Sequence, residues 1–418
     1  MTEKGDGTEQ KEVSEDDPPE NGSEQVPSAK KLSPGKRHLK KQESTFFGRN
    51  SMMLGDTNVP LYKQLHLSWT RPPSNCLVIK KYHDPAVLKK FKMMCIWLIT
   101  VRGLDVYVEE KDFEELQTIK AGELPRSSSY DNFKSISTKN LDIEFIGLIE
   151  KIKVWKIGKD KLNNKIDFIA CLGGDGTLLY ASSLFQRSVP PIIAFSLGSL
   201  GFLTPFDFKE FPTVLNKVLK GTLGFTLRNR LESTLWSRGA EGESEEDDDH
   251  IIIPESVQVL NEVVIHRGIY SGVCMIDIYC DEFFVTTVIG DGVIVATPTG
   301  STAYAAATGA SIVAPSVPCY IIAPICPHSL SFRPIMVPLN CSLKCKLNKD
   351  ARGDAQISFD GRHMQDFTKN HIVDISASEY PLPCIDKEGS MQDWFNGLQN
   401  TLLWNGRSSA QKPLEKKK

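Results

Sequence analysis

The chain has 418 residues, of which 40% are hydrophobic, and its formal net charge is -3 at pH 7. This length and apolar content allow two domains beside polar segments. Because the charge is nearly balanced, no global basic field indicates a nucleic-acid partner. The longest apolar run, Met93 to Val101, is much shorter than the roughly 20 residues that span a bilayer. We therefore expect neither a nucleic-acid nor a membrane partner.

The ten cysteines lie mostly inside apolar segments, and no Cys-x-x-Cys pair occurs. Cys341 and Cys345 lie close in sequence without a histidine nearby, so we expect reduced structural cysteines and no thiolate metal site. The N-terminal segment is rich in acids and has no apolar signal core, which argues against a targeting peptide. These features predict a cytoplasmic protein of the cytosol.

Two charged tails and one insertion stand outside the predicted domains. Residues 1–60 begin acidic and turn basic from Lys30, and such blocks cannot bury enough apolar surface to fold. We expect a disordered tail there, with a regulatory or partner-binding role as the alternative. We expect residues 407–418 to form a second disordered tail. The acidic segment 239–250 is predicted to be an exposed insertion.

Residues 75–225 predict an α/β nucleotide-binding domain. Asp84 and Pro85 start a helix, because aspartate caps a helix and proline suits its first turn, and Gly103 ends it. Residues 110–140 are polar and turn-rich, so we expect a loop, in which Arg126–Ser129 is either plain loop or a phosphorylation site. Strand, helix and strand in this order imply a parallel sheet covered on both faces. The predicted strands are Cys76–Ile79, Leu104–Val108, Asp167–Leu172 and Pro191–Phe195, and a further helix is Phe211–Leu219.

Residues 226–384 predict a second, mainly β domain. Alternating apolar residues dominate this part of the chain, and Asp281-Glu282 suits a hairpin turn between two of its strands. A helical apolar stripe then follows in residues 390–406, and we expect this helix to pack back on the α/β domain. The predicted strands are Phe225–Trp236, Ser256–Ile265, Val273–Tyr279 and Phe283–Ile289.

The turn Gly173-Gly174-Asp175-Gly176 is the most informative segment. An apolar strand leads into it, and an apolar helix begins at Thr177. Glycines let the backbone approach a phosphate, and a helix start offers free N–H groups and the positive end of a dipole. A carboxylate there would repel phosphate unless it organises Mg²⁺ or accepts a proton from an attacking hydroxyl. The alternative is that Asp175 merely caps its helix.

Two common nucleotide-binding fingerprints are absent from the sequence. No Gly-x-x-x-x-Gly-Lys-Ser/Thr segment occurs, which excludes a P-loop. The residues after Asp175 also do not fit Gly-x-Gly-x-x-Gly, so we do not expect an ordinary hydride-transfer Rossmann domain.

Asn261 and Glu262 interrupt a strongly apolar strand. Burying Glu262 without a partner would be costly, so the carboxylate needs a hydrogen bond. A ribose hydroxyl pair or an adenine amine would suit it, and an internal salt bridge is the equally plausible structural alternative.

A third polar segment begins with Gly290-Asp291-Gly292 and continues, after a strand, through Thr297 to Tyr304. Its small residues permit close ligand approach, and they open a helix that continues through Ala307 and Gly309. Ser and Thr hydroxyls with N-terminal amides supply donors. Close helix–sheet packing with a Ser/Thr cap is the alternative.

Taken together, these segments resemble the NAD kinase family. The glycine turn alone is shared with phosphofructokinases and with diacylglycerol or sphingosine kinases, so the resemblance implies a related α/β fold plus the mainly β domain. The other segments make the likeness specific, and the eukaryotic branch is the most similar. The matching segments are Leu172–Thr177, Leu197–Thr204, Asn261-Glu262, Asp291-Gly292, Thr297–Tyr304 and Pro327–Pro334.

The resemblance implies a role for each matching residue. Asp175 corresponds to the family's catalytic aspartate, and Asn261 and Glu262 to the pair that contacts the adenosine part of NAD. Arg362 falls where relatives place another substrate-contacting residue. Further nucleotide-binding positions implied by the family are Gly173, Gly174, Gly176, Thr177, Asp291, Thr299, Gly300, Ser301, Thr302, Ala303, Tyr304 and Ala307. It also implies NAD and ATP as substrates, Mg²⁺ held mainly by the ATP phosphates, and a homo-oligomer.

Three positions depart from the family pattern. His266 stands where animal members carry Asp, whereas bacterial relatives have His. Arg362 replaces a Gln of bacterial relatives, and Ser196 replaces an Asn. These differences bear on donor and substrate preference rather than on the class of reaction.

The predicted reaction transfers the γ-phosphoryl group of ATP to the 2′-hydroxyl of the adenosine ribose of NAD, which gives NADP. Such transfers proceed mostly through loose transition states, so positioning outweighs base strength. Asp175 would accept the proton late, while backbone amides near Gly173–Thr177 stabilise phosphates. The alternatives are a lipid kinase that shares the glycine turn and a non-catalytic NAD-binding sensor. A lipid kinase would leave Asn261-Glu262 unexplained, and an intact Asp175 speaks against a sensor.

Overall fold

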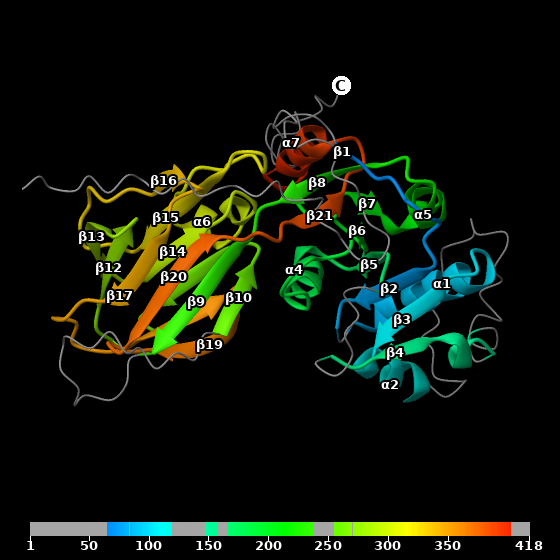
Figure 1. The fold of residues 1–418 in the computed structure, drawn as a ribbon, viewed down its shortest axis with the longest axis horizontal. Coiled ribbons are helices and arrows are strands. Elements are labelled where there is room, and N and C mark those ends of the chain that lie inside the picture. The colour runs from blue at the N-terminus through cyan, green and yellow to red at the C-terminus, as the bar shows by residue number, and fades with distance from the viewer. Residues whose placement is uncertain are drawn as a thin grey trace, which may run out of the picture. The chain divides into compact units, whose positions relative to one another are not determined.

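The computed structural model describes residues 65–82, 84–118, 145, 147–157, 165–237, 255–269 and 271–402 (Figure 1). All of them belong to one compact unit. They form an α/β part around a nine-stranded sheet and a β part of two six-stranded sheets. Both charged tails, the acidic insertion and the segment Arg126–Ser129 lie outside the described residues.

The central strands of the first sheet are parallel. β2 (Asn75–Lys80) pairs with β3 (Asp105–Glu109) on one side and with β5 (Phe168–Leu172) on the other, and β6 (Ile192–Ser196) follows β5. Every residue of β5 and β6 is buried, as expected for a parallel sheet with both faces covered. The other strands of this sheet are β1 (Leu65–His66), β4 (Lys153–Trp155), β7 (Phe206–Asp207), β8 (Gly224–Arg228) and β21 (Leu382–Ile385).

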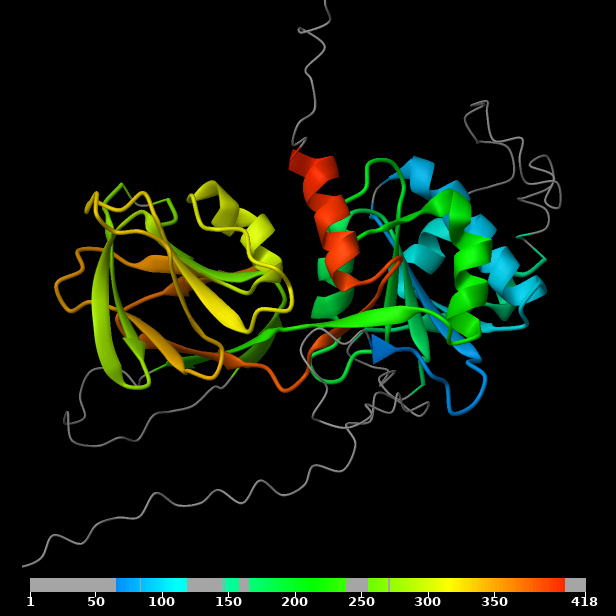
Figure 2. The same cartoon turned by 90° about the horizontal axis from the view of Figure 1, so that it is seen from above.

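Helices cover both faces of this sheet (Figure 2). Residues of β2 alternate between the two sides: Cys76 and Val78 lie in one apolar core, and Leu77 and Ile79 lie in the other. The first core contains residues of α1 and α5, and the second contains residues of α4. The helices are α1 (Pro85–Thr100), α2 (Glu110–Thr118), α4 (Asp175–Ser183), α5 (Phe211–Leu219) and α7 (Ser390–Leu402), with the 3₁₀ helices η1 (Ile149–Lys151) and η2 (Phe208–Glu210).

Two antiparallel sheets form the β part and share one apolar core. Ile276 and Ile375 of one sheet lie in this core with Val263 and Val295 of the other. The first sheet has the order β10 (Glu255–Val259), β9 (Leu231–Ser237), β20 (His371–Ala377), β17 (Leu343–Leu347), β12 (Cys274–Cys280) and β13 (Phe283–Gly290). The second has the order β16 (Ile335–Pro338), β15 (Cys319–Ile325), β14 (Gly292–Ala296), β11 (Glu262–His266), β18 (Ala355–Phe359) and β19 (Arg362–Phe367).

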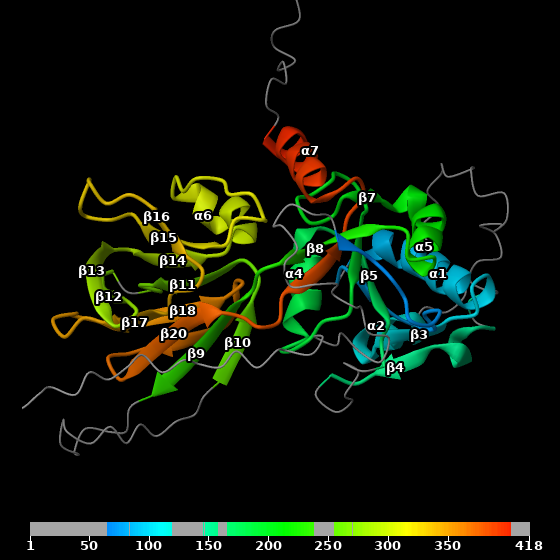
Figure 3. The same ribbon diagram turned by 45° about the horizontal axis from the view of Figure 1, so that its top comes forward.

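The opposite face of the second sheet is covered by two short helices, η3 (Thr299–Thr302) and α6 (Tyr304–Ala307). Figure 3 shows α6 lying over β14 and β15. Ala305 of α6 packs with Val264, Ile294 and Ala323 in a small apolar core. The helix predicted through Ala307 and Gly309 is thus a single turn, preceded by a 3₁₀ turn and followed by Gly309 at a φ of 79°.

Most predicted elements of the α/β part are confirmed. The predicted strands correspond to β2, β3, β5 and β6, and the helix Phe211–Leu219 is α5. Asp84 caps α1, since its carboxylate accepts a hydrogen bond from the backbone N–H of Ala86 at 3.1 Å. In the β part, the Asp281-Glu282 hairpin turn is also confirmed. Both residues have positive φ, as a two-residue turn of this twist requires.

Three predictions about elements are wrong. Glu110–Thr118 is the helix α2 rather than loop. The helix was not predicted because it contributes few apolar residues, such as Leu116, to the core. The strand predicted at Phe225–Trp236 is two strands, β8 and β9, which belong to different sheets. The strand predicted at Ser256–Ile265 is likewise two strands, β10 and β11, with a break at Leu260-Asn261.

The last helix begins at Ser390 and packs through Leu398, which is buried. A Cβ atom on Gly397 would lie 3.1 Å from the Phe202 ring, so the helix lies against residues of the α/β part. Trp394 is half-buried and Phe395 is exposed, so only part of the predicted apolar stripe faces the protein. None of the helices described here is long and apolar enough to cross a membrane.

Candidate active site

The glycine turn joins the buried end of β5 to the start of α4. The N–H of Gly173 donates to the carbonyl of Phe195 at 3.0 Å, which ties the turn to the neighbouring strand. A Cβ atom on Gly173 would lie 2.1 Å from Oγ1 of Thr177, so only glycine fits there. Around Gly174 and Gly176, by contrast, the Cβ positions face open space. The backbone is therefore open to a ligand at these two residues.

Asp175 does not cap its own helix. The N-cap residue is Gly174, and no side chain caps α4. The Asp175 carboxylate instead accepts hydrogen bonds from the backbone N–H groups of Phe202 and Leu203, each at 3.0 Å. A Cβ atom on Gly201 would lie only 2.2 Å from Oδ1 of Asp175. The glycine of this segment therefore allows the loop to close on the carboxylate and hold it in one orientation.

A pocket of about 510 Å³ lies at the glycine turn. It is lined by Gly174 and Gly176 of the turn and by Thr177 just after it, together with basic and aromatic side chains from β2 and the residues that follow it, α2, α4 and β19. These further lining residues are Lys80, Lys81, Tyr82, Lys111, Tyr180 and Arg362. Free N–H groups at a helix start and several cations suit the phosphates of a nucleotide.

The cations of this pocket differ in how far they are already neutralised. Lys80 is fully buried and forms ion pairs with Asp112 at 3.1 Å and with Glu115 at 2.6 Å. Lys111 pairs with Glu109 at 2.7 Å. These two lysines are held by carboxylates and mainly shape the pocket.

Two cations of the pocket are better placed to receive phosphate. Lys81 is largely exposed, and among the described residues its one ion pair is with Asp84, at 3.1 Å. Arg362 lies over the ring of Tyr180, 4.8 Å from its centroid, and forms a long hydrogen bond of 3.5 Å to the carbonyl of Gly176.

Asn261 and Glu262 are held by a carboxylate from the turn between β18 and β19. Oδ2 of Asp360 accepts from the N–H of Leu260 at 2.8 Å, and Oδ1 accepts from Asn261 at 2.7 Å and from Glu262 at 3.1 Å. On the other side, the N–H of Thr297 donates to the carbonyl of Asn261 at 2.8 Å. This segment is therefore fixed through its backbone, which leaves its side chains available.

The two side chains contain acceptor atoms that have no partner. Oδ1 of Asn261 and Oε2 of Glu262 are buried and make no hydrogen bond to any residue that the structure describes. No basic group in the described part of the chain forms an ion pair with Glu262, so the internal salt bridge considered above is absent there. Burial, with a further contribution from the charge of Asp360, raises the pKa of Glu262 to about 8. Because unpaired buried acceptors are costly, these atoms suit the hydroxyl or amine donors of a ligand.

A second pocket, of about 320 Å³, lies at Glu262. Asp291 lines it and forms an ion pair with Arg267 at 2.9 Å. Tyr304 lines it too, with its side chain largely exposed. The other lining residues are Val264, His266, Arg267, Gly268, Ile325, Ser358 and Gly361.

The segment that follows β14 supports this second pocket from behind. A Cβ atom on Gly300 would lie 2.2 Å from the carbonyl oxygen of Asn261, so glycine permits the close approach. The Ser301 hydroxyl is fully buried, donates to the carbonyl of Pro298 at 2.7 Å and accepts from the N–H of Val313 at 2.9 Å. Thr299 accepts a hydrogen bond of 3.4 Å from Arg228. Neither pocket is lined by Thr299–Ala303 or by Ala307.

The turn of Asp360, Gly361 and Arg362 connects the two pockets. Arg362 lines the cationic pocket, and the neighbouring Gly361 lines the pocket at Glu262. Both Asp360 and Gly361 have positive φ, 50° and 67°, so the turn bends sharply between the pockets. The two candidate ligand sites therefore meet at this turn.

Several residues of the cationic pocket were not predicted from the sequence, above all Lys80, Lys81, Lys111 and Tyr180. One signal was present for the first two. Lys80 is the last residue of β2, a parallel strand that pairs with β5, and Lys81 follows it. Ligands bind at this carboxyl end of such sheets. Lys111 and Tyr180 lie on helices, at positions that only the tertiary fold brings together.

Two of the residues that depart from the family pattern lie in different surroundings. His266 lines the pocket at Glu262, and its Nδ1 accepts from the N–H of Gly268 at 3.0 Å. Burial lowers the pKa of His266, so the neutral ring is favoured. Ser196 is buried at the end of β6, and its hydroxyl oxygen has no hydrogen-bond partner among the described residues.

A glycine turn at the end of a parallel strand, a cationic pocket over it and a carboxylate beside it define a kinase that phosphorylates a small molecule. The chain matches the ATP-NAD kinase N-terminal domain over residues 76–223 and the ATP-NAD kinase C-terminal domain over residues 260–387. It therefore belongs to the NAD kinase family.

Curated relatives and a solved structure agree with this assignment. The chain is 38% identical over 349 residues to a probable NAD kinase of Oryza sativa subsp. japonica, which covers 83% of this chain and 59% of the relative. An uncharacterized kinase of Schizosaccharomyces pombe is 34% identical over 357 residues, covering 82% of this chain and 83% of the relative. The crystal structure of yeast NADH kinase complexed with NADH superposes with a TM-score of 0.68 at 29% identity, covering 87% of this chain and 97% of that one. The chain spans 32%, 59% and 64% of the length of three rice relatives that it matches.

Proposed function

We propose that this chain is an NAD kinase, which transfers the γ-phosphoryl group of ATP to the 2′-hydroxyl of NAD and so supplies NADP. The observation that carries the proposal is the meeting of two pockets at the Asp360–Arg362 turn. One is cationic and open to the glycine turn, and the other presents the unpaired acceptor of Glu262. Membership of the NAD kinase family supports the same reaction.

The donor ATP is assigned to the cationic pocket. The backbone at Gly174 and Gly176 is open to phosphate oxygens, while Lys81 and Arg362 supply positive charge. Mg²⁺ would enter as part of the Mg–ATP substrate.

The acceptor NAD is assigned to the pocket at Glu262. The carboxyl group of Glu262 and the amide of Asn261 would exchange hydrogen bonds with the adenosine ribose or base. Asp291 and Tyr304 lie in the same pocket and would contact the remainder of the dinucleotide. Gly300 and Ser301 would act indirectly, because they hold the segment against Asn261.

Asp175 is the group we assign to the proton of the attacking hydroxyl. Its two backbone hydrogen bonds hold the carboxylate in place, and the lone pairs that they leave free can accept a proton. Because phosphoryl transfer has a loose transition state, the proton needs to move only late, and a fixed carboxylate is sufficient.

The direct test is product formation by the purified protein. It is incubated with ATP and Mg²⁺ and, in separate reactions, with NAD, NADH, a diacylglycerol or a sphingoid base. Formation of NADP or NADPH is measured with an NADP-specific dehydrogenase. We expect phosphorylation of the dinucleotide and none of the lipids. Lipid phosphorylation without dinucleotide phosphorylation, or NAD binding without any turnover, would overturn the proposal.

Asp175→Asn tests the assigned proton acceptor. Loss of general-base help should lower kcat by about 10² to 10⁴-fold. Because the asparagine keeps the shape of the side chain, NAD should still bind. Asp350→Asn, at an exposed turn, is the matched control and should leave kcat unchanged. Near-normal turnover by Asp175→Asn would show that another group takes the proton.

We also propose that the protein is a cytosolic homo-oligomer. β13 is an edge strand with exposed Phe283, Phe284 and Val285, an apolar surface that suits a second copy of this chain. All ten cysteines are free thiols, which is compatible with a reducing compartment. Light scattering of the natural protein and of Phe284→Ser, together with imaging of the tagged chain in cells, tests both points.

A further inference from the structure

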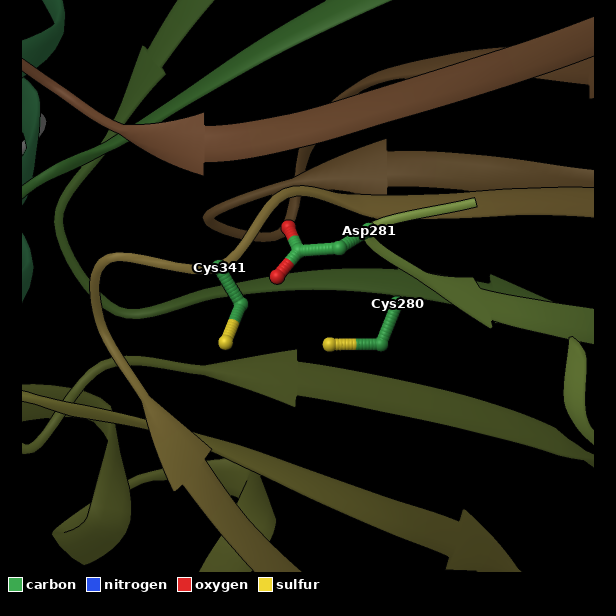
Figure 4. A group of neighbouring side chains, drawn as sticks. All are labelled: Cys280, Asp281 and Cys341. Atoms are coloured by element: carbon green, nitrogen blue, oxygen red, sulfur yellow. The ribbon is translucent and has the colours of Figure 1, made fainter. Parts of the chain in front are cut away.

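Two thiols and a carboxylate meet at the tip of the β12–β13 hairpin. The possible ligand atoms of Cys280, Asp281 and Cys341 all lie within 4.8 Å of one another. Figure 4 shows the two sulfur atoms near each other, with the Asp281 carboxylate beside them. Among the residues that the structure describes, this is the one group of three such side chains close enough to hold a metal ion.

The fold brings these residues together from distant parts of the sequence. Cys280 ends β12 and pairs with Leu343 at the start of β17. Cys341 lies two positions before Leu343, and both Cys280 and Cys341 pack against the apolar core that contains Leu343. The backbone N–H of Asp281 donates to the carbonyl of Ser342 at 2.9 Å, which joins the hairpin tip to the segment before β17.

The arrangement suits a tetrahedral ion with soft ligands. A Zn–S distance of about 2.3 Å places two thiolates about 3.8 Å apart in a tetrahedral site. Donor atoms within 4.8 Å of one another need only small side-chain movements to reach that geometry. The N–H of Ser342 donates to Oδ1 of Asp281 at 2.8 Å, which orients the carboxylate and leaves its other oxygen as the ligand. Cys280 and Cys341 are half-buried and Asp281 is exposed, so a fourth position opens to water.

We propose that Cys280, Cys341 and Asp281 bind a soft divalent cation of the zinc class. On binding, both thiols release their protons to solvent, and the two thiolates, the carboxylate and one water complete the coordination. Cys280 belongs to the β12–β13 hairpin and Cys341 to the segment before β17, so the ion would link the hairpin to that segment.

This site is separate from the two substrate pockets. Cys274, at the other end of β12, pairs with Gly290 beside Asp291 of the substrate pocket. At 3.4 Å per residue, the length of β12 places Cys280 about 20 Å away from that end. The ion therefore has a structural role, and phosphoryl transfer does not require it. Failure of this proposal would leave the proposed kinase activity untouched.

The test uses Co²⁺ as a coloured substitute for Zn²⁺. The full chain is reduced with a phosphine, freed of metal with a chelator and titrated with Co²⁺. We expect a near-ultraviolet sulfur-to-cobalt band at one equivalent, lost when Zn²⁺ is added, and a rise in the unfolding temperature with Zn²⁺. The band should be lost in Cys280→Ser and in Cys341→Ser but retained in Cys326→Ser, whose cysteine is exposed and lies outside the group.

Asp281→Asn separates the carboxylate from the thiols. Asparagine tolerates the φ of 47° at this turn position, so the hairpin should persist while the ligand loses its charge. We expect at least about tenfold weaker Co²⁺ binding, in the range seen when metal-site partners are removed. The Co²⁺ titration of the unsubstituted protein tests the proposal even if a variant fails to fold. A titration without a sulfur-to-cobalt band would overturn the proposal, as would a disulfide forming between Cys280 and Cys341 with no metal uptake.

Discussion

The carboxylate of Asp360 is predicted to control both stability and NAD binding, because it holds the backbone of residues 260–262. Replacing it by asparagine keeps the shape of the side chain, and asparagine also tolerates the positive φ of 50°. The change leaves one acceptor oxygen where two are used. If that oxygen takes the place of Oδ1, it retains the bonds to Asn261 and Glu262, and the new NH₂ group faces the N–H of Leu260.

The expected effect follows from these three hydrogen bonds. A hydrogen bond to a charged group contributes about 1.5–3 kcal/mol, and a buried N–H left without a partner costs about 1–3 kcal/mol. Burial also raises the pKa of Asp360, because the charged carboxylate is destabilised inside the folded protein. Neutral asparagine removes this unfavourable free energy, which offsets part of the hydrogen-bond loss. We therefore expect Asp360→Asn to lower the free energy of unfolding by about 2 kcal/mol.

The assays are chemical unfolding and calorimetric titration with NAD. Because the weakened backbone carries Asn261 and Glu262, the variant should bind NAD at least about tenfold more weakly, which corresponds to about 1.4 kcal/mol. Asp350→Asn, at an exposed turn, should match the natural protein in both assays. If Asp360→Asn unfolds at the natural midpoint and binds NAD with natural affinity, the anchoring role of this carboxylate is refuted.

Three further changes test other parts of the site. Burial raises the pKa of Glu262 from 4.5 to about 8. The protonated side chain therefore contributes its full stabilisation of the folded state below about pH 4.5, and this contribution is lost as the pH rises through about 8. Unfolding free energy should fall across this range by up to about 1.4 kcal/mol per pH unit, and an equal slope in Glu262→Gln would contradict this. Arg230→Lys should lower the unfolding free energy by about 3 kcal/mol, because one ammonium cannot replace four hydrogen bonds to carbonyls, and a denaturant titration measures the loss. Gly201→Ala should displace Asp175 and reduce kcat about 100-fold, whereas Gly198→Ala, where a Cβ atom meets nothing within 4 Å, should keep full turnover.

The α/β part can be predicted well from the sequence, because buried parallel strands are continuous apolar runs and glycines mark the ends of the helices between them. Gly103 and Gly221, for example, both follow helices and both have positive φ. The break between β10 and β11 escaped prediction for the opposite reason. Leu260 is buried and keeps the apolar pattern intact, so the interruption depends on the Asp360 carboxylate, which lies about a hundred positions further along the chain.

The candidate site could be predicted only where its residues form a local motif. Asp175, Glu262 and Asp291 lie in recognisable segments, and two of them line a described pocket. Lys111 and Tyr180 carry no local signal, because a lysine on an amphipathic helix is ordinarily solvated. The proximity of Cys280 and Cys341 could not be predicted either, because metal sites are recognised in a sequence by closely spaced ligands and these two residues are far apart in the chain.

Two chain connections join the α/β part and the β part, and arginine side chains add further contacts between them. The chain leaves the first sheet through β8, enters the β part at β9, and returns from β20 to β21 beside β8. Arg230 lies at the first crossing, fully buried, and donates to the carbonyls of Ser182, Phe185 and Arg187 at the C-terminal end of α4.

Arg362 contacts the other end of the same helix, through the carbonyl of Gly176. One helix of the α/β part is thus held at both ends by arginines that belong to, or border, the β part. Because α4 begins at Asp175, these contacts set the position of the carboxylate relative to the pocket at Glu262. Accurate placement of two substrates is the main requirement of a reaction with a loose transition state. Arg230 is therefore a positioning residue, and Arg362 positions α4 in addition to supplying positive charge to the donor pocket.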